Sequence, residues 1–347
     1  MMIPRLMRSV SFSLSLGLIV SAIGVWLVAR GVDPAQLSRV LSTADYGWVL
    51  IGATAIGVTF FARAYRWAVL LHPIRYRGPT LMAALLIGQT LNFLLPLRAG
   101  DVARSVALGR APGSSVERVL GSVAIEKVWD WIALTALVLI VALIVPLPDW
   151  FVGPARAFGL AATLLLIGLG LVVTRRQRGL MLIDRLFGWS KIPFRGLSDR
   201  WRQFVLERLN RLLDGMESLR RREAAWRAAL WSAVTWLSGV AANAAVMRAF
   251  GVDSWPAAMF LMAVLMVGVA LPPSIAALGI FEALTMLALG VFNVPNETGL
   301  AIGLTLHLVV SVPAILAGSF LVVWESRAGR PPVPWAARTQ MDPVPHD

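Results

Sequence analysis

The stretch Gly88-Gln-Thr-Leu-Asn-Phe-Leu-Leu-Pro-Leu-Arg-Ala-Gly-Asp-Val-Ala-Arg104 decides how this chain folds. An apolar run ends at Pro96, and the charged residues Arg98, Asp101 and Arg104 follow directly. Because 58% of the 347 residues are hydrophobic and the mean hydropathy is +0.73, we expect these charges at or inside a lipid bilayer. Ionisable groups are costly there and commonly mark a pathway or a binding site.

Working outward from this stretch, the hydrophobic content indicates an α-helical membrane protein. An ordinary globular domain is only about half apolar, and a spanning helix needs about 20 apolar residues. Six windows meet that requirement and are predicted to cross the bilayer. They are residues 11–29, 46–71, 116–145, 156–174, 226–250 and 298–324.

Two further apolar segments are too short to cross, and each ends at a proline. Residues 80–95 would form a helix of about 24 Å, against a hydrocarbon core of about 30 Å, and residues 256–271 are similarly short. An acid follows each break, Asp101 in one half and Glu282 in the other. We therefore predict two re-entrant hairpins that begin on opposite sides of the membrane, a pattern typical of inverted-repeat transporters.

The predicted fold is an all-α polytopic membrane protein with six full transmembrane helices and two re-entrant broken-helix hairpins in two inverted-repeat halves. Residues 1–326 form a single membrane domain, with a first half at 10–174, a basic cytoplasmic segment at 175–227 and a second half at 228–324. A short cytoplasmic tail occupies residues 327–347. The basic segment holds 14 basic and 6 acidic side chains, so the positive-inside rule predicts that it faces the cytoplasm. Both termini are predicted to be cytoplasmic, and the protein is expected in the plasma (inner) membrane.

The charge and cysteine content limit the classes of partner. The net charge of +13 would suggest nucleic acid in a soluble chain, but here the arginines are expected to face anionic lipid headgroups, and no nucleic-acid partner is predicted. The absence of cysteine excludes disulfides, thiolate zinc sites and thiol catalysis. Apolar residues at helical spacing between Trp201 and Leu219 predict an amphipathic helix, either on the inner membrane surface or against the bundle.

Arg98, Asp101 and Arg104 are spaced three residues apart, so on a helix they share a face. Two guanidinium groups that flank a carboxylate can hold a phosphate bidentately. A structural ion pair that closes the hairpin explains the same spacing equally well. Arg63 is a third candidate for a lipid-phosphate contact, whereas Arg66 is expected to extend toward the cytoplasmic interface.

Other polar residues in apolar segments extend this candidate site. Four carboxylates are predicted to balance the arginine charges: Asp101, Glu126, Asp130 and, from the second half, Glu282. Lys127, beside Glu126, is predicted as a further charge partner in this group. Four more are candidates to line a polar cavity, although helix packing explains them as well: Gln89, Asn92, Ser274 and His307. We find no metal-binding, nucleotide-binding or nucleophile motif, so neither a metal nor a cofactor is predicted.

The order of these motifs resembles the lysylphosphatidylglycerol synthase transmembrane-region family, also described as flippase-like membrane proteins. The resemblance runs from about residue 14 to 324 and rests on Arg66-Trp67, residues 92–101 with Arg104, Glu117-Arg118, Glu126-Lys127 with Asp130, and residues 272–282. Members of the family often have glutamate where this chain has Asp101, and arginine where it has Lys127. Both differences keep the sign of the charge. The segment from Ser274 to Gly279 departs from the family's usual serine–glycine pairing.

The resemblance implies a lipid translocator. In two-domain members the membrane part is thought to move an aminoacylated lipid made by a soluble domain, and no such domain is expected after Trp324 here. We therefore predict a flippase-like protein for a phospholipid or lipid-linked headgroup, with membrane lipids as its partners. The alternative is a membrane enzyme, or an accessory subunit beside a lipid-modifying synthase or glycosyltransferase. A third possibility is a scaffold whose amphipathic helix recruits such a synthase.

Overall fold

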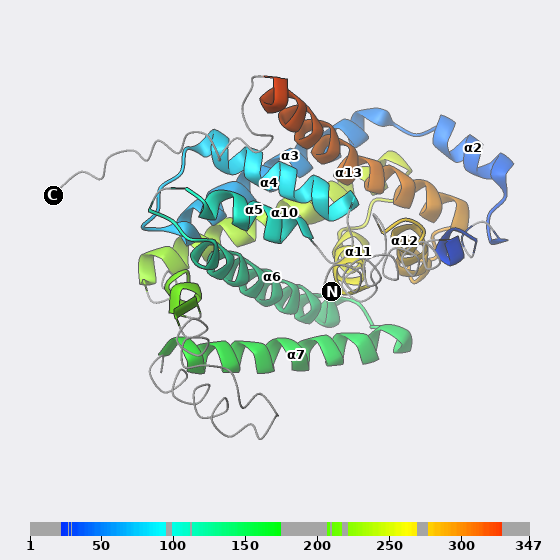
Figure 1. Ribbon diagram of the computed structural model, residues 1–347. Helices are drawn as coiled ribbons and strands as arrows, with labels where there is room; N and C mark the ends of the chain where they lie inside the picture. Colours follow the sequence, from blue (N-terminus) through cyan, green and yellow to red (C-terminus); the bar gives the residue numbers. More distant parts are fainter. Residues whose placement is uncertain are drawn as a thin grey trace, which may run out of the picture.

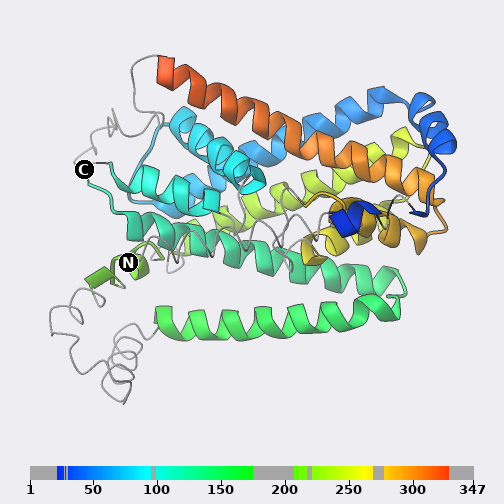
Figure 2. The ribbon, with the colours of Figure 1, turned by 45° about the vertical axis from the view of Figure 1, so that its right-hand side comes forward.

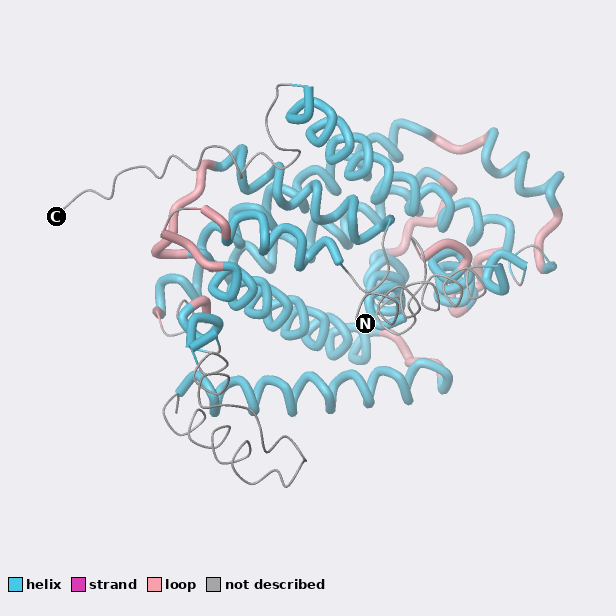
Figure 3. The backbone as a smooth tube through the Cα atoms, in the orientation of Figure 1, coloured by secondary structure: helices cyan, strands magenta, loops and turns pink. Residues whose placement is uncertain are grey.

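A computed structural model describes residues 22–26, 28, 30–94, 99–111, 113–174, 207–208, 210–216, 221–268 and 277–327. All regular structure within these ranges is helical (Figure 3). The helices form a bundle in which long members run alongside shorter ones (Figure 1). The predicted all-α class is therefore confirmed.

Five helices of the described part are long and apolar enough to cross a membrane. They are α3 (Tyr46–Leu71), α6 (Val116–Ile144), α7 (Asp149–Thr174), α10 (Arg222–Ala249) and α13 (Asn296–Arg327). These five correspond to the predicted spans from 46–71 onward, while most of the window 11–29 lies outside the described residues. Helix α7 begins seven residues before the predicted start, because Asp149 in its first turn favours a helix N-terminus.

The two short segments before the proline breaks are helices, and each is followed by another short helix. In the first pair, α4 (Gly78–Leu94) packs against α5 (Ala99–Gly109). Gly88 faces Gly100 so closely that a Cβ atom on Gly100 would lie 1.8 Å from the Gly88 carbonyl oxygen. The Tyr76 hydroxyl, just before α4, donates to the Leu108 carbonyl at 2.9 Å near the end of α5. The two helices are therefore antiparallel.

The second pair repeats this arrangement in the other half of the chain. Helix α11 (Trp255–Gly268) packs against α12 (Ile280–Gly290). Gly268 lies against Leu284, and the rings of Phe260 and Phe292 are 6.0 Å apart between centroids. Late residues of α11 thus meet early residues of α12, so this pair is also antiparallel.

The two hairpins start at opposite ends of the bundle. At one end, Asp45 N–H donates to the Ala249 carbonyl at 2.9 Å, just before α11 begins. At the other end, His72 contacts Arg221 at 2.6 Å, just before α4 begins. We call this second region the basic end because arginines gather around it. They are Arg75, Arg77, Arg110, Arg118, Arg208, Arg211, Arg221 and Arg222.

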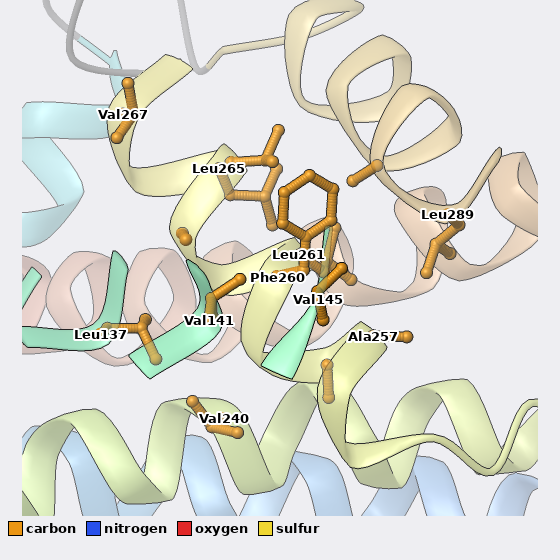
Figure 4. Close-up of a cluster of buried hydrophobic side chains, with 14 of the residues drawn as sticks. Leu137, Val141, Val145, Val240, Ala257, Phe260, Leu261, Leu265, Val267 and Leu289 are labelled. Carbon is orange, nitrogen blue, oxygen red and sulfur yellow. The ribbon is translucent and has the colours of Figure 1, made fainter. Parts of the chain in front are cut away.

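The main hydrophobic core surrounds α11. Phe260 and Leu261 of α11 are fully buried and pack with side chains of α6, α10, α12 and α13 (Figure 4). Because α11 is apolar on all sides, it is the central element of this half. Helix α7 lies at the edge of the bundle beside α6 (Figure 2). Its exposed Leu160 and Leu164 are typical of a lipid-facing helix.

Two elements refine the sequence interpretation. Helix α2 (Pro34–Ser42) was not predicted, although Asp33 caps it by accepting from Ala35 N–H at 2.9 Å and a proline opens it. The predicted amphipathic helix 201–219 is described at 207–208 and 210–216. There Gly215 packs closely against Gly121 of α6, so this part lies against the bundle.

Candidate functional site

The bundle brings seven ionisable side chains together between α3, α5 and α6. We call them the charge cluster: Arg63, Arg66, Asp101, Arg104, Glu126, Lys127 and Asp130. Residues three or four apart on a helix share a face, which is why Arg63 with Arg66, and Glu126 with Asp130, project from single faces of α3 and α6. Helix packing then places these faces opposite each other.

Glu126 is the centre of the cluster. Its carboxylate is fully buried, and Arg104 donates to it at 2.8 Å. The guanidinium groups of Arg63 and Arg66 each lie 3.5 Å from its other oxygen. A buried carboxylate needs such partners, because an isolated charge in an apolar interior is strongly disfavoured.

The other two carboxylates lie to either side of Glu126. Asp130 is 2.7 Å from Arg66. Asp101 is 3.0 Å from Arg104 and 3.2 Å from Lys127. The ion pairs thus form one connected network instead of separate pairs.

Two amides of α4 extend the network toward the first hairpin. Gln89 accepts a hydrogen bond from Arg63 at 3.2 Å, and Asn92 donates to Asp101 at 3.4 Å. The structure therefore places both predicted amides beside the charges. Their neighbour Thr90 instead donates to the Ala314 carbonyl of α13 at 2.8 Å, so α4 also contacts the second half.

The cluster has more cationic groups than its own carboxylates neutralise. When all seven groups are ionised, four cations face three anions. Nε and Nη1 of Arg104 and Nε of Arg66 are buried and have no hydrogen-bond partner among the described residues. Arg104 also lies over the Trp67 ring, 4.5 Å from its centroid. Unpaired buried donors are unfavourable, and an anion with several oxygens would satisfy them.

The remaining predicted site residues lie elsewhere. Arg98 and Ser274 fall outside the described residues. Glu282 contacts His307 of α13 at 2.6 Å, and no described arginine contacts it. This carboxylate, predicted to balance arginine charge, thus pairs with histidine.

Arg66 does not lie where we predicted it, and Ser232 is a member of the site that the sequence does not indicate. Arg66 is fully buried and donates to the Ser232 hydroxyl of α10 at 3.0 Å, so the expectation that it reaches the interface was wrong. The sequence did contain a feature that indicates the true position of Arg66. It lies three residues after Arg63, so both side chains project from the face of α3 that meets the acids of α6. Ser232 has no comparable signal in the sequence.

The comparisons with known proteins find similarity over most of this chain. Residues 14–318 match the family described as the lysylphosphatidylglycerol synthase TM region. The chain is also similar to a protein named Glycosyltransferase AglD from Haloferax volcanii, at 25% identity over 343 residues. That similarity covers 91% of this chain and 54% of the relative, so the chain spans about half of the relative's length. With the match covering most of the spans and the entire charge cluster, this multi-pass membrane protein belongs to the lysylphosphatidylglycerol synthase transmembrane-region family.

Proposed function

We propose that this protein is a lipid translocator that moves a phospholipid or lipid-linked headgroup across the plasma membrane. The charge cluster binds the phosphate of that headgroup. The observation that carries the proposal is the buried Arg104, whose Nε and Nη1 lack partners among the described residues, inside a cluster with surplus positive charge.

Phosphate suits this site chemically. A guanidinium group presents paired N–H donors that match two phosphate oxygens, and a phosphodiester carries a single negative charge that balances the surplus cation. Electrostatic attraction is stronger in a buried site than in water. Binding therefore requires no new charge from the protein, and Glu126 limits the surplus in the empty site to one cation, where its absence would leave two.

The arrangement of the hairpins supports alternating access. The pair α4–α5 begins at the basic end and the pair α11–α12 at the opposite end, as expected for two inverted-repeat halves. The positive-inside rule places the basic end in the cytoplasm. In this proposal the two pairs are re-entrant, six helices span the bilayer, and both termini are cytoplasmic.

The test is headgroup movement in vesicles that contain the purified full chain. Fluorescent phosphatidylglycerol is incorporated, and the fraction protected from an added quencher is followed over time. Arg104→Gln, and separately Arg98→Ala, should lower the transport rate at least tenfold. Arg156→Gln removes the same charge from exposed α7 and should leave the rate unchanged. Equal rates in wild type and Arg104→Gln, with both proteins folded, would remove the phosphate-binding role.

A second candidate function follows from the relative named a glycosyltransferase. In that case the same cationic site holds a lipid-linked phosphate while sugar is transferred, by this chain or by a partner enzyme. Incubation of the purified chain with nucleotide-sugars and polyprenyl phosphate separates the two functions. Formation of a glycosylated lipid supports the second candidate, and lipid movement without product formation supports translocation.

A further inference from the structure

Helix α2 lies at the end of the bundle opposite the basic end and has no fully buried residue. Two contacts hold the chain just before it to the start of α13. Asp33 N–H donates to a Glu297 carboxylate oxygen at 3.4 Å, and the Asn296 amide donates to the Gly31 carbonyl at 3.4 Å. Figure 1 shows α2 at the margin of the bundle beside the first turns of α13. The described residues therefore leave much of the surface of α2 uncovered.

The sequence of α2 gives the helix two different faces. Leu37, Val40 and Leu41 are spaced three and four residues apart, so they form one apolar stripe. Gln36 and Arg39 form a polar stripe on another side of the helix and are exposed. The three apolar side chains are only half-buried. A helix with an apolar and a polar face is typical of a segment that lies in the plane of the membrane interface.

An open groove of about 420 Å³ runs along one side of α2. It is lined by Pro34, Leu37, Ser38, Leu41, Ser42 and Tyr46. The Tyr46 hydroxyl donates to the Leu41 carbonyl at 2.9 Å, which holds the aromatic ring against the end of the helix. Ser38 and Ser42 are four residues apart, so their side chains line the same edge. The groove therefore combines an apolar wall with a hydroxyl-bearing edge, as a lipid with apolar chains and a polar headgroup requires.

The groove opens onto the lipid-facing surface of α3. Tyr46 begins this span, and Leu50 lies one turn further along the same face. Their side chains are 56% and 70% exposed. Trp255 is also exposed at this end of the bundle, where α11 begins. Because tyrosine and tryptophan gather at the membrane–water interface, these rings put α2 at the level of the interface and its groove beside the acyl chains.

We infer that the α2 groove binds a phospholipid of the leaflet opposite the basic end. The acyl chains lie against Leu37, Leu41 and Tyr46, and the headgroup lies beside the two serines. Arg39 is the one charged side chain within α2, so apolar contact carries the binding and headgroup charge does not. The groove is separate from the charge cluster and binding there requires no lipid movement, so this inference does not rest on the proposed function.

The first experiment measures the surroundings of α2 in the full chain. The sequence has no cysteine, so a nitroxide can be attached to Leu41→Cys in the groove and to Arg39→Cys on the polar face, in phosphatidylcholine nanodiscs. We expect the ratio of relaxation by oxygen to relaxation by a water-soluble nickel complex to be about threefold higher at position 41 than at position 39. Leu50→Cys provides the lipid reference, and Pro295→Cys provides the water reference.

Three results of this measurement would overturn the inference. Equal ratios at positions 41 and 39 would mean that α2 is surrounded by water. A label at position 41 that is shielded from both reagents would mean that protein covers the groove, as in contact with a second copy of the chain. A difference that develops only when anionic lipid is added would mean that charge, and not apolar contact, holds α2 at the membrane.

The second experiment identifies the lipid contact directly. Phosphatidylcholine with a diazirine near the glycerol end of one acyl chain is photolysed in nanodiscs, and mass spectrometry locates the adducts. We expect adducts on α2 and Tyr46, with adducts on lipid-facing α7 as the internal standard. Relative to that standard, Leu41→Asn should lower the α2 adducts about threefold because it puts an amide in the apolar groove. Gln36→Ala, on the side away from the groove, should leave them unchanged.

A further variant keeps this test independent of folding. Ser38 is exposed, so Ser38→Asp puts a charge at the edge of the groove without disturbing a buried side chain, and it should also lower the α2 adducts. Thermal melts verify that each variant is folded. Adducts on α7 with none on α2 in the wild type would overturn the inference. Equal α2 labelling in Ser38→Asp and Gln36→Ala would overturn it as well.

Discussion

Arg104 and Glu126 meet at 2.8 Å where both side chains are removed from solvent, with exposures of 2% and 0%. They come from α5 and α6, and Glu126 also receives Arg63 and Arg66 from α3. One carboxylate thus connects three helices. A buried ion pair adds little stability over apolar packing but is damaging when half removed, so each of these side chains depends strongly on its partners.

Loss of Glu126 should therefore destabilise the protein strongly. Glu126→Gln leaves three guanidinium groups without their shared anion, and we expect a loss of about 3–5 kcal/mol in the free energy of unfolding. Denaturant unfolding in detergent measures it. The double variant Glu126→Gln with Arg104→Gln should lose less than the sum of the two single variants, because it removes a cation together with the anion. Additive losses would show that the two side chains do not interact.

The close approach of α4 and α5 should not tolerate a methyl group. Gly100→Ala places a Cβ atom 1.8 Å from the Gly88 carbonyl oxygen, so the two helices must separate. We expect this separation to lower the free energy of unfolding by about 1–3 kcal/mol or more. Thermal melts and the vesicle transport assay should both show the loss. Gly159→Ala on α7 is the matched control, because nothing lies within 4 Å of its new methyl group. A Gly100→Ala protein as stable as this control would contradict the observed packing.

The contact of His72 with Arg221 predicts a pH dependence of stability. Burial, followed by the charges of Arg221 and Arg75, lowers the pKa of His72 below its usual value. The unfolded chain therefore binds a proton at higher pH than the folded chain does, and stability falls as the pH drops through about 6.5. Melting temperatures from pH 8 to 5 should decline less in His72→Gln than in wild type. An identical decline in the two proteins would show that groups other than His72 cause the pH dependence of stability.

The predicted orientation can be tested with single cysteines, since the chain has none. Arg110→Cys lies at the basic end, and Pro295→Cys lies at the opposite end near the start of α13; both positions are exposed. A membrane-impermeant maleimide should label position 110 only from the cytoplasmic side and position 295 only from the outer side. Labelling of both positions from the same side would contradict the prediction that the two hairpins begin on opposite faces of the membrane.

The sequence by itself determined where the helices lie. The predicted span 46–71 coincides with α3. The two short segments that precede proline breaks correspond to α4 and α11, each of which pairs with the short helix that follows it, α5 or α12. Hydropathy, segment length and proline are local properties of the chain, so they can be read without knowledge of packing. Helix α2 was not predicted because nine residues with an N-terminal cap give a much weaker sequence signal than a membrane span does.

Only the tertiary structure decided which charges meet. The three-residue spacing predicted that Arg98, Asp101 and Arg104 share a helix face. Helix packing brings Glu126 to Arg104. It also places Arg66 between Asp130 and Ser232. In the same way, Glu282 contacts His307, 25 residues further along the chain. The energy of an ion pair depends on distance and on the surrounding dielectric. Both are set by the packing of whole helices, which no local pattern of residues specifies.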